Sequence, residues 1–476
     1  MYDRHALAIE GKNYHAMLND KQADIFETVV SNVRCKTGGL FFFYGYRGTG
    51  KTFLWKTIIS NLRSEGKIVL AVASSGIASL LFEGGRTAHS RFKIPIDVNE
   101  NSTCDIKQQS FLAELIVQYD LIIWDEAPMN HKFVFEAVDR SIRNLMHHKD
   151  KNNLNKPLRG KTVLLGGDFR QILPVLPKKG HEDIVMASVN KSYLWDDCIV
   201  FKLEKNMCIE SGVPAVTIFG QKKPYADWVV GVGDGNVPSV ASVEGSEPCW
   251  AEIPPELHLD PEDDGKRVII DTVYAELCDS PKNSDYYRDR AILTPLNEDV
   301  DLINKEVIKR FKEYLNSFKI GGIPNHELEL KIGAPIVLLR NLAPNKGLCN
   351  GTRLIVTQLC ARVIEGVIIS GNHIGEKTFI PRICMRPIDT TLPFVFRRVQ
   401  FPVSLCYAMT INKSQGQTLK FVGLYLPDPV FSHGPFYVGI SRVITPLGLH
   451  IVCEEKNHPL VGMTKNVVYH EVFTNL

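Results

Sequence analysis

Short apolar runs alternate with helical patterns through the first two hundred residues of the chain. Each run ends in small or polar residues, and four are expected to form strands: residues 40–44, 68–73, 121–124 and 162–165. This alternation is typical of a parallel sheet flanked by helices. Because open α/β sheets bind ligands outside the carboxyl ends of their strands, we expect ligand-binding residues to follow these runs.

The pattern changes in the second half of the chain. Between residues 236 and 264, Pro, Gly, Ser and acidic residues replace the periodicity, which indicates an irregular connection. A strand at 290–295 and a helix at 300–311 then predict a second α/β unit. Short strand-like runs separated by turns fill residues 330–403, so a small β-rich insertion is expected there. The second unit is predicted to end with strands at 422–426 and 449–452.

Composition restricts the class of protein. The chain has 476 residues, 44% hydrophobic and 23% charged, which suits two or more packed domains. Its formal net charge is only +2, so any nucleic-acid site must be a local patch. No apolar run reaches the length of a membrane span and no signal-peptide core is present, so a soluble intracellular protein without membrane partners is expected. The eleven cysteines include no Cys-x-x-Cys pair, which argues against a zinc ribbon.

The sequence Gly-Tyr-Arg-Gly-Thr-Gly-Lys-Thr at residues 45–52 matches the phosphate-binding loop pattern at every fixed position. Its glycines allow successive backbone N–H groups to face an anion at a helix N-terminus. We expect Lys51 to reach the β- and γ-phosphates of ATP and the Thr52 hydroxyl to coordinate Mg²⁺. The candidate nucleotide ligands in this loop are Gly45, Gly48, Thr49, Gly50, Lys51 and Thr52.

Two further polar groups follow expected strands downstream of this loop. Asp125 and Glu126 end the apolar run 121–124. Asp125 is expected to hold the metal, and Glu126 to orient or deprotonate the water that attacks the γ-phosphorus. Gly-Gly-Asp-Phe-Arg-Gln at 166–171 follows the next strand, where Gln171 is a candidate sensor that donates to the γ-phosphate and accepts from water.

Longer segments resemble the petite-integration-frequency (PIF-type) DNA helicases, which are superfamily 1 helicases. The resemblance runs from about residue 18 to residue 453, in a form similar to the helicase portion of Helitron-type transposons. Its motifs are Ala-Ser-Ser-Gly-Ile-Ala at 73–78, Gly-Arg-Thr-Ala-His-Ser at 85–90, Trp-Asp-Glu-Ala-Pro-Met at 124–129, the 166–171 segment with Leu-Pro at 173–174, and two late motifs at 408–419 and 436–442.

The resemblance implies an α/β fold of two tandem RecA-like P-loop NTPase domains, with parallel sheets flanked by helices and a small β-rich insertion in the second. Combined with the pattern along the chain, it predicts a first ATP-binding domain at 1–205 with a small wedge insertion at about 93–115. An irregular connection follows at 206–285, and the second RecA-like domain covers 286–476 with a β-barrel-like insertion at about 341–400.

The activity that the resemblance implies is ATP- and Mg²⁺-dependent 5′-to-3′ DNA unwinding, driven by translocation of a monomer on single-stranded DNA towards duplex junctions. Gln22 would read the adenine, and Arg442 would be an arginine finger from the second domain. Because phosphate contacts carry no base information, weak base specificity is expected. DNA repair, recombination and telomere maintenance in the nucleus, or alternatively the mitochondrion, are the implied roles. The residues expected near the DNA strand are Ser74, Ser75, His89, Ser90, Lys413, Ser414 and Gln415.

Two departures from the family pattern support an alternative. Cys208 stands where the family has an arginine expected to touch the γ-phosphate, and a thiol lacks the fixed charge and forked donors of a guanidinium. The stretch 306–328 is also shorter than in the family. The alternative function is a catalytically impaired, helicase-like relic that binds ATP or single-stranded DNA without productive unwinding. An RNA substrate also stays open, since phosphate contacts do not distinguish the sugars.

Overall fold

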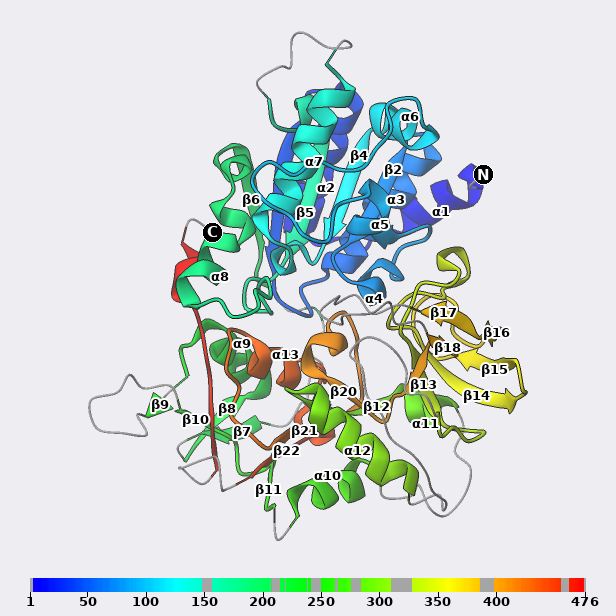
Figure 1. The fold of residues 1–476 in the computed structure, drawn as a ribbon. Helices are drawn as coiled ribbons and strands as arrows, with labels where there is room; N and C mark the ends of the chain where they lie inside the picture. Colours follow the sequence, from blue (N-terminus) through cyan, green and yellow to red (C-terminus); the bar gives the residue numbers. More distant parts are fainter. Residues whose placement is uncertain are drawn as a thin grey trace. The chain divides into compact units, whose positions relative to one another are not determined.

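The structure of the chain is a computed structural model, drawn as a ribbon in Figure 1. The chain divides into two compact units, Met1–Ile209 with Val468–Leu476, and Glu210–Val467. Each unit contains a parallel β-sheet of its own. The structure describes residues 3–147, 156–205, 207, 215–218, 220–237, 239–240, 250–261, 264–274, 284–309, 328–385, 398–454 and 462–474.

The first unit is built on a six-stranded sheet in which neighbouring strands run parallel in the order β3-β2-β4-β5-β1-β6. The four strands expected from apolar runs are confirmed, and they are the four interior strands. Interior parallel strands are buried on both faces and read as continuous apolar runs. The edge strand β3 has only two residues, and β6 is a mostly apolar run that was not among the expected strands. The strands are β1 (Gly39–Gly45), β2 (Val69–Ala73), β3 (Arg86–Thr87), β4 (Leu121–Asp125), β5 (Thr162–Gly167) and β6 (Cys198–Leu203).

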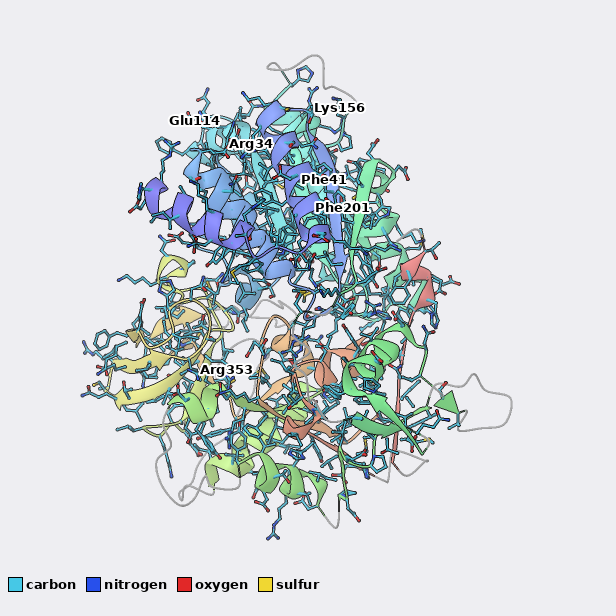
Figure 2. The ribbon with its side chains drawn as sticks, turned by 180° about the vertical axis from the view of Figure 1, so that it is seen from behind. Arg34, Phe41, Glu114, Lys156, Phe201 and Arg353 are labelled. Atoms are coloured by element: carbon cyan, nitrogen blue, oxygen red, sulfur yellow. The ribbon has the colours of Figure 1, made fainter. Side chains whose placement is uncertain are left out.

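Alternate side chains of β1 point to opposite faces of this sheet. Phe41 and Phe43 pack in a core with helices α2 and α3, and Phe41 stacks on Phe201 of β6 with ring centroids 5.9 Å apart (Figure 2). Leu40 faces the other way, towards apolar side chains of β4, β5 and α7 around a small apolar cavity. The helices of the unit are α1 (Arg4–His15), α2 (Asp20–Cys35), α3 (Lys51–Ser64), α4 (Gly76–Ser79), α5 (Ala88–Phe92), α6 (Phe111–Gln118), α7 (Lys132–Leu145) and α8 (His181–Ala187).

The C-terminal segment of the chain returns to the first unit. The imidazole of His181 in α8 stacks on the ring of Tyr469 with centroids 3.9 Å apart. Asn190 donates to the carbonyl of Val472 at 2.9 Å, and the Val472 side chain is fully buried. The sequence-based division assigns this segment to a second domain at 286–476. The structure places the segment in the first unit instead. So short a segment has no periodicity, and only its tertiary contacts determine where it packs.

The second unit is built on a five-stranded parallel sheet in the order β11-β22-β21-β12-β20. The three expected strands are its central strands, and helix α12 (Asn297–Lys309) covers the region where a helix was expected. No helix of the described residues, in either unit, is long and apolar enough to cross a membrane. The strands are β11 (His258–Leu259), β12 (Arg290–Thr294), β20 (Ala408–Thr410), β21 (Phe421–Leu426) and β22 (Leu449–Cys453).

An antiparallel sheet with its own apolar core forms the expected β-rich insertion, in the order β16-β15-β14-β13-β19. Among the described strands β16 and β19 stand at its two edges, so the sheet is open rather than closed into a barrel. The strands are β13 (Pro335–Leu338), β14 (Arg353–Leu359), β15 (Val363–Ile368), β16 (Lys377–Pro381), β19 (Val403–Leu405) and a separate antiparallel pair, β17 (Ile383–Met385) with β18 (Arg398–Gln400).

A buried arginine joins this antiparallel sheet to the parallel one. Arg353, which is labelled in Figure 2, lies at the start of β14. Its side chain is 2% exposed. Its Nη2 donates to the carbonyls of Tyr287 at 2.8 Å and Arg290 at 3.3 Å. These bonds from the buried guanidinium to backbone carbonyls hold the insertion against the start of β12.

The stretch 206–285, expected to be an irregular connection, contains regular elements. Strand β10 pairs with β23 (Met463–Lys465), and β11 joins the edge of the parallel sheet beside β22. Strands this short form only because distant segments pair with them, so no local pattern predicts them. The elements are β7 (Ala215–Ile218), β8 (Gln221–Pro224), α9 (Tyr225–Asp234), β9 (Ser239–Val240), β10 (Trp250–Glu252), β11, α10 (Gly265–Val273) and the start of α11 (Ser284–Arg288).

Candidate nucleotide and nucleic-acid sites

The glycine loop joins the end of β1 to the start of α3, as its sequence predicts. Gly48 and Gly50 have φ angles of 87° and 81°, in the left-handed region that favours glycine. A Cβ on Gly50 would lie 2.5 Å from Nε2 of Gln22, and a Cβ on Gly45 would lie 2.7 Å from the Thr49 hydroxyl. The loop is therefore closely packed, and the backbone conformation at Gly48 and Gly50 favours glycine.

The polar side chains of the loop lie where the helix begins. Lys51 is the first residue of α3, and its Nζ donates to the carbonyls of Gly45 and Tyr46. The Thr49 hydroxyl donates to the Tyr46 carbonyl at 2.8 Å, which closes the loop on itself. Thr52 follows Lys51 in the first turn of α3. The helix N-terminus, the loop amides and the lysine together provide the positive end that a phosphate requires.

Gln22 connects helix α2 to this loop. Its Oε1 accepts from the backbone N–H of Asn19 at 3.2 Å, which completes a capping box at the start of α2. Its Nε2 donates to the carbonyl of Thr49 at 3.3 Å, and the side chain is 2% exposed. Both ends of the amide are thus bonded to the protein and support the loop. The reading of adenine by Gln22 stays a prediction.

Asp125 ends β4 and is 4% exposed. Burial raises the pKa of its carboxyl above the ordinary value, while the charge of Lys51, the backbone amide of Glu126 and the Trp55 indole act in the opposite direction. Its Oδ1 is buried without a hydrogen-bond partner among the described residues. A buried carboxylate oxygen of this kind needs a cation, so Asp125 fits a Mg²⁺ ligand.

The expected metal site has few protein ligands. The described residues contain no cluster of three or more His, Cys, Asp or Glu side chains. Asp125 and the neighbouring helix start with Thr52 therefore fit only a cation that takes its other ligands from phosphate and water, which is how Mg²⁺ binds beside nucleotides. The assignment of Thr52 as the second ligand stays a prediction.

Glu126 has an unusual backbone. Its φ and ψ are 53° and 38°, a left-handed conformation that costs a non-glycine residue about 1–3 kcal/mol. The residue leads directly into a short helical turn, η1 (Ala127–Met129), and its side chain is 8% exposed. Strain of this kind persists only where the surrounding structure fixes it. Asp125 belongs to the extended strand β4, whereas Glu126 is left-handed, so the two consecutive carboxylates have different backbone conformations.

The segment that carries Gln171 is packed tightly against these elements. A Cβ on Gly166 would lie 2.3 Å from the Trp55 ring of α3, and one on Gly167 would lie 2.3 Å from Cδ of Pro128 in η1. Gln171 is 4% exposed, and its backbone N–H bonds to the Asp168 carbonyl. The glycine pair therefore lets β5 approach both the nucleotide helix and the carboxylate turn. The sensor role of Gln171 stays a prediction.

The structure adds two residues that sequence reasoning missed. The Trp55 indole lies close enough to lower the pKa of Asp125, and the guanidinium carbon of Arg170 lies 5.4 Å from the ring centroids of both Tyr44 and Tyr46. Arg170 therefore connects the segment of Gln171 to the phosphate loop. The sequence signal for Arg170 was the pair of tyrosines on either side of Gly45, because aromatic rings commonly pack against a buried arginine.

The candidate DNA residues of the first unit lie at the carboxyl end of β2 and on α5. Ser75 caps α4, with its hydroxyl accepting from the Ala78 N–H at 3.2 Å. The Ser74 hydroxyl accepts hydrogen bonds from the side chains of Trp124 and Asn130. His89 and Ser90 lie in the first turn of α5, and the Ser90 N–H bonds to the Thr87 hydroxyl. Parallel pairing of β2 and β3 brings the two segments to one edge of the sheet.

His89 carries a pH prediction. Burial lowers the pKa of its imidazole below the ordinary value of 6.5, so the folded protein holds this ring neutral. As the pH falls through about 6.5, the unfolded chain takes up a proton that the folded chain does not, and stability is lost. We expect acidification from about pH 8 to about pH 5 to lower the thermal unfolding midpoint of the parent more than that of His89→Gln. An equal decrease in both proteins would contradict the assignment.

The late candidate residues lie together in the second unit. Lys413 is exposed, whereas the Ser414 hydroxyl is buried and donates to the Ile411 carbonyl at 2.6 Å. Gln415 is 1% exposed. Arg442 is 3% exposed, and its guanidinium donates to the carbonyls of Val438, Ser414 and Gln417 and to the Ser441 hydroxyl. Arg442 therefore joins the two late motifs, and its arginine-finger role stays a prediction.

Two family models match this chain. The model described as PIF1-like helicase matches residues 17–242, and that described as DNA helicase Pif1, 2B domain, matches residues 313–359. Together they span more than half of the chain. The chain belongs to the PIF1-like helicase family. The expected family is confirmed.

Relatives and solved structures agree with this family. The ATP-dependent DNA helicase PIF1 of Homo sapiens is 26% identical over 452 residues, which cover 91% of this chain and 60% of that protein. Pif1 of Campylobacter jejuni is 27% identical over 436 residues, 87% of this chain and 89% of that protein. A Bacteroides Pif1 helicase in complex with ADP-AlF3 and ssDNA has a TM-score of 0.63 at 22% identity, covering 92% of each chain. The expected fold of two RecA-like domains is thereby confirmed.

The chain spans about three fifths of the length of its human, rat and mouse relatives. Cys208, which stands where the family has an arginine, lies outside the described residues, as does most of the stretch 306–328.

Proposed function

We propose that this PIF1-like chain is an ATP-dependent DNA helicase that couples ATP hydrolysis to 5′-to-3′ movement on single-stranded DNA. The observation that carries the proposal is the buried Asp125 carboxylate at the end of β4, within the electrostatic influence of Lys51 at the start of α3. A phosphate loop beside a buried acidic strand end suits ATP hydrolysis. The names of the human and Campylobacter relatives and the ssDNA in the Bacteroides complex support the DNA substrate.

The residues of the first unit divide the chemistry among them. Lys51 and the loop amides bind the β- and γ-phosphates and hold them in a fixed geometry. Glu126 orients the attacking water and accepts its proton at a carboxylate oxygen. Gln171 would position the same water. Mg²⁺, held by Asp125 and Thr52, would neutralise charge on the phosphate oxygens.

The DNA side of the proposal rests on neutral and basic side chains at the strand ends. Hydroxyls at Ser74, Ser75 and Ser90, together with the exposed Lys413, suit phosphate oxygens rather than base edges. Binding that depends on the backbone is expected to be tolerant of sequence. We propose that a single chain is the active species, although one related structure describes two coordinating Pif1 helicases at forked DNA.

Steady-state ATP hydrolysis with and without single-stranded DNA tests this function. We expect DNA to stimulate turnover, and a duplex with a 5′ tail to be unwound while one with a 3′ tail is not. If the rate of ATP hydrolysis per chain does not change with protein concentration, a monomer is supported. The absence of both DNA stimulation and unwinding would reject the helicase function.

Cys208 gives the second candidate function, a relic that binds ATP or single-stranded DNA without productive unwinding. Comparison of the parent with Cys208→Arg separates the two. DNA-stimulated turnover together with unwinding in the parent excludes the relic. Activity that appears only in Cys208→Arg identifies the missing guanidinium as the defect, since a thiol cannot supply its charge.

A further inference from the structure

Two buried side chains meet on the hydroxyl of Ser74. The indole Nε1 of Trp124 donates to Ser74 Oγ at 3.2 Å, and Nδ2 of Asn130 donates to the same oxygen at 2.8 Å. Trp124 is 2% exposed and Asn130 is 8% exposed, whereas Ser74 is partly exposed. Ser74 thus stands between a buried polar pair and solvent.

These two bonds determine what the hydroxyl can still do. A serine hydroxyl has two acceptor lone pairs and one proton. Trp124 and Asn130 occupy both lone pairs, so only the proton is left to make a further bond. In this structure the backbone carbonyl of Asp125 is its acceptor at 3.5 Å, the outer limit of a hydrogen bond. The proton is therefore available to a better acceptor, and a phosphate oxygen is a strong one.

The same pair connects Ser74 to the carboxylate turn. Trp124 and Asp125 are consecutive in β4, so their side chains point to opposite faces of the sheet. The Trp124 ring also stacks near Phe92 of α5, with centroids 5.8 Å apart. Asn130 follows the η1 turn that begins at the strained Glu126. The strand end that carries the nucleotide carboxylates therefore also fixes the segments that carry the DNA candidates.

We propose that Trp124 and Asn130 are positioning residues that hold the Ser74 hydroxyl as a donor for a phosphate oxygen of single-stranded DNA. The inference rests on the proposed function, because it specifies how one of its DNA contacts is made. It predicts that Asn130 acts on DNA binding only through Ser74.

Affinity for single-stranded DNA, measured by fluorescence anisotropy at fixed salt, tests the proposal. Ser74→Ala removes the donor and is expected to weaken binding about tenfold, the value of a hydrogen bond to a charged group. Asn130→Asp replaces the donor amide by an acceptor of the same shape, which takes the Ser74 proton, so a similar loss is expected. Trp124→Phe frees one lone pair and is expected to weaken binding about threefold.

A double variant separates positioning from the added negative charge of Asn130→Asp. If Asn130 acts through Ser74, the variant Ser74→Ala/Asn130→Asp binds no more weakly than Ser74→Ala alone. Salt dependence gives a second readout. A neutral hydroxyl releases no counterion, so Ser74→Ala leaves the salt slope unchanged, whereas Lys413→Ala is expected to reduce it by about 0.7. The control for Trp124→Phe is Trp195→Phe, which makes the same change at another buried tryptophan of this unit. It is expected to bind single-stranded DNA with parental affinity.

The outcomes distinguish failure of this inference from failure of the proposed function. A parent that does not bind single-stranded DNA rejects the proposed function and the inference with it. A parent that binds, with Ser74→Ala and Trp124→Phe at parental affinity, rejects the inference alone. Full additivity of Asn130→Asp with Ser74→Ala also rejects it. Thermal unfolding of each variant confirms the fold, and Trp124→Phe provides the test if Asn130→Asp does not fold.

Discussion

Replacing Lys51 by alanine is expected to reduce ATP hydrolysis at least about a thousandfold, with and without DNA. The side chain is the cation at the start of α3 and lies against the loop carbonyls of Gly45 and Tyr46. Its loss removes the charge that stabilises the transferring phosphoryl group, and it also removes the charge that offsets the burial of Asp125. The measurement is steady-state phosphate release at saturating ATP, together with binding of a fluorescent ATP analogue.

Lys56→Ala provides a control in the same helix. Lys56 is exposed one turn after the phosphate loop, so its removal changes the net charge by the same amount without touching the site. We expect turnover of Lys56→Ala to stay within about twofold of the parent. Turnover that survives in Lys51→Ala would mean that the loop at residues 45–52 is not the catalytic nucleotide site.

Glu126→Gln is expected to lower turnover by about 10²–10⁴-fold while ATP binding is retained. Glutamine has the shape of glutamate and meets the same left-handed backbone, with φ of 53°, so the substitution tests the charge and basicity of the side chain. An amide cannot accept the proton of the attacking water. Phosphate release and nucleotide affinity are measured side by side, because loss of the base should affect the first and not the second.

Glu114→Gln is the matched control for this change. Glu114 is exposed on α6, which precedes β4 in the same unit, and the substitution removes an equal charge. Parental turnover is expected. If Glu126→Gln also hydrolyses ATP at the parental rate, another group activates the water, and the strained backbone at Glu126 has a purely structural origin.

The sequence predicts the parts of the site that are continuous along the chain. The phosphate loop, the acidic end of β4 and the segment of Gln171 each depend on a strand followed by a few specific residues, and all three lie in the first unit beside α3. Their glycines were predicted as phosphate ligands or turns. Gly166 and Gly167 in fact meet Trp55 and Pro128, a packing requirement that involves residues more than thirty positions away.

What the sequence could not predict depends on pairings between distant segments. Asn130 carries no motif of its own, and its contact with Ser74 joins residues 56 positions apart. The pairing of β10 with β23 and of β11 with β22 is likewise decided by distant partners. Local pattern therefore identifies interior strands and contiguous ligands, whereas side chains that position those ligands appear only with the tertiary structure.

The return of the C-terminal segment to the first unit, through Tyr469 and Val472, makes the second unit an insertion within the first. Both ends of the inserted unit are anchored, and a doubly tethered body has fewer accessible orientations than one on a single linker. A backbone cut between the units would leave the fragments held by the C-terminal contacts. Deleting Val468–Leu476 would instead leave the second unit joined to the first by a single connection, with a wider range of orientations. The deletion would remove none of the candidate catalytic residues.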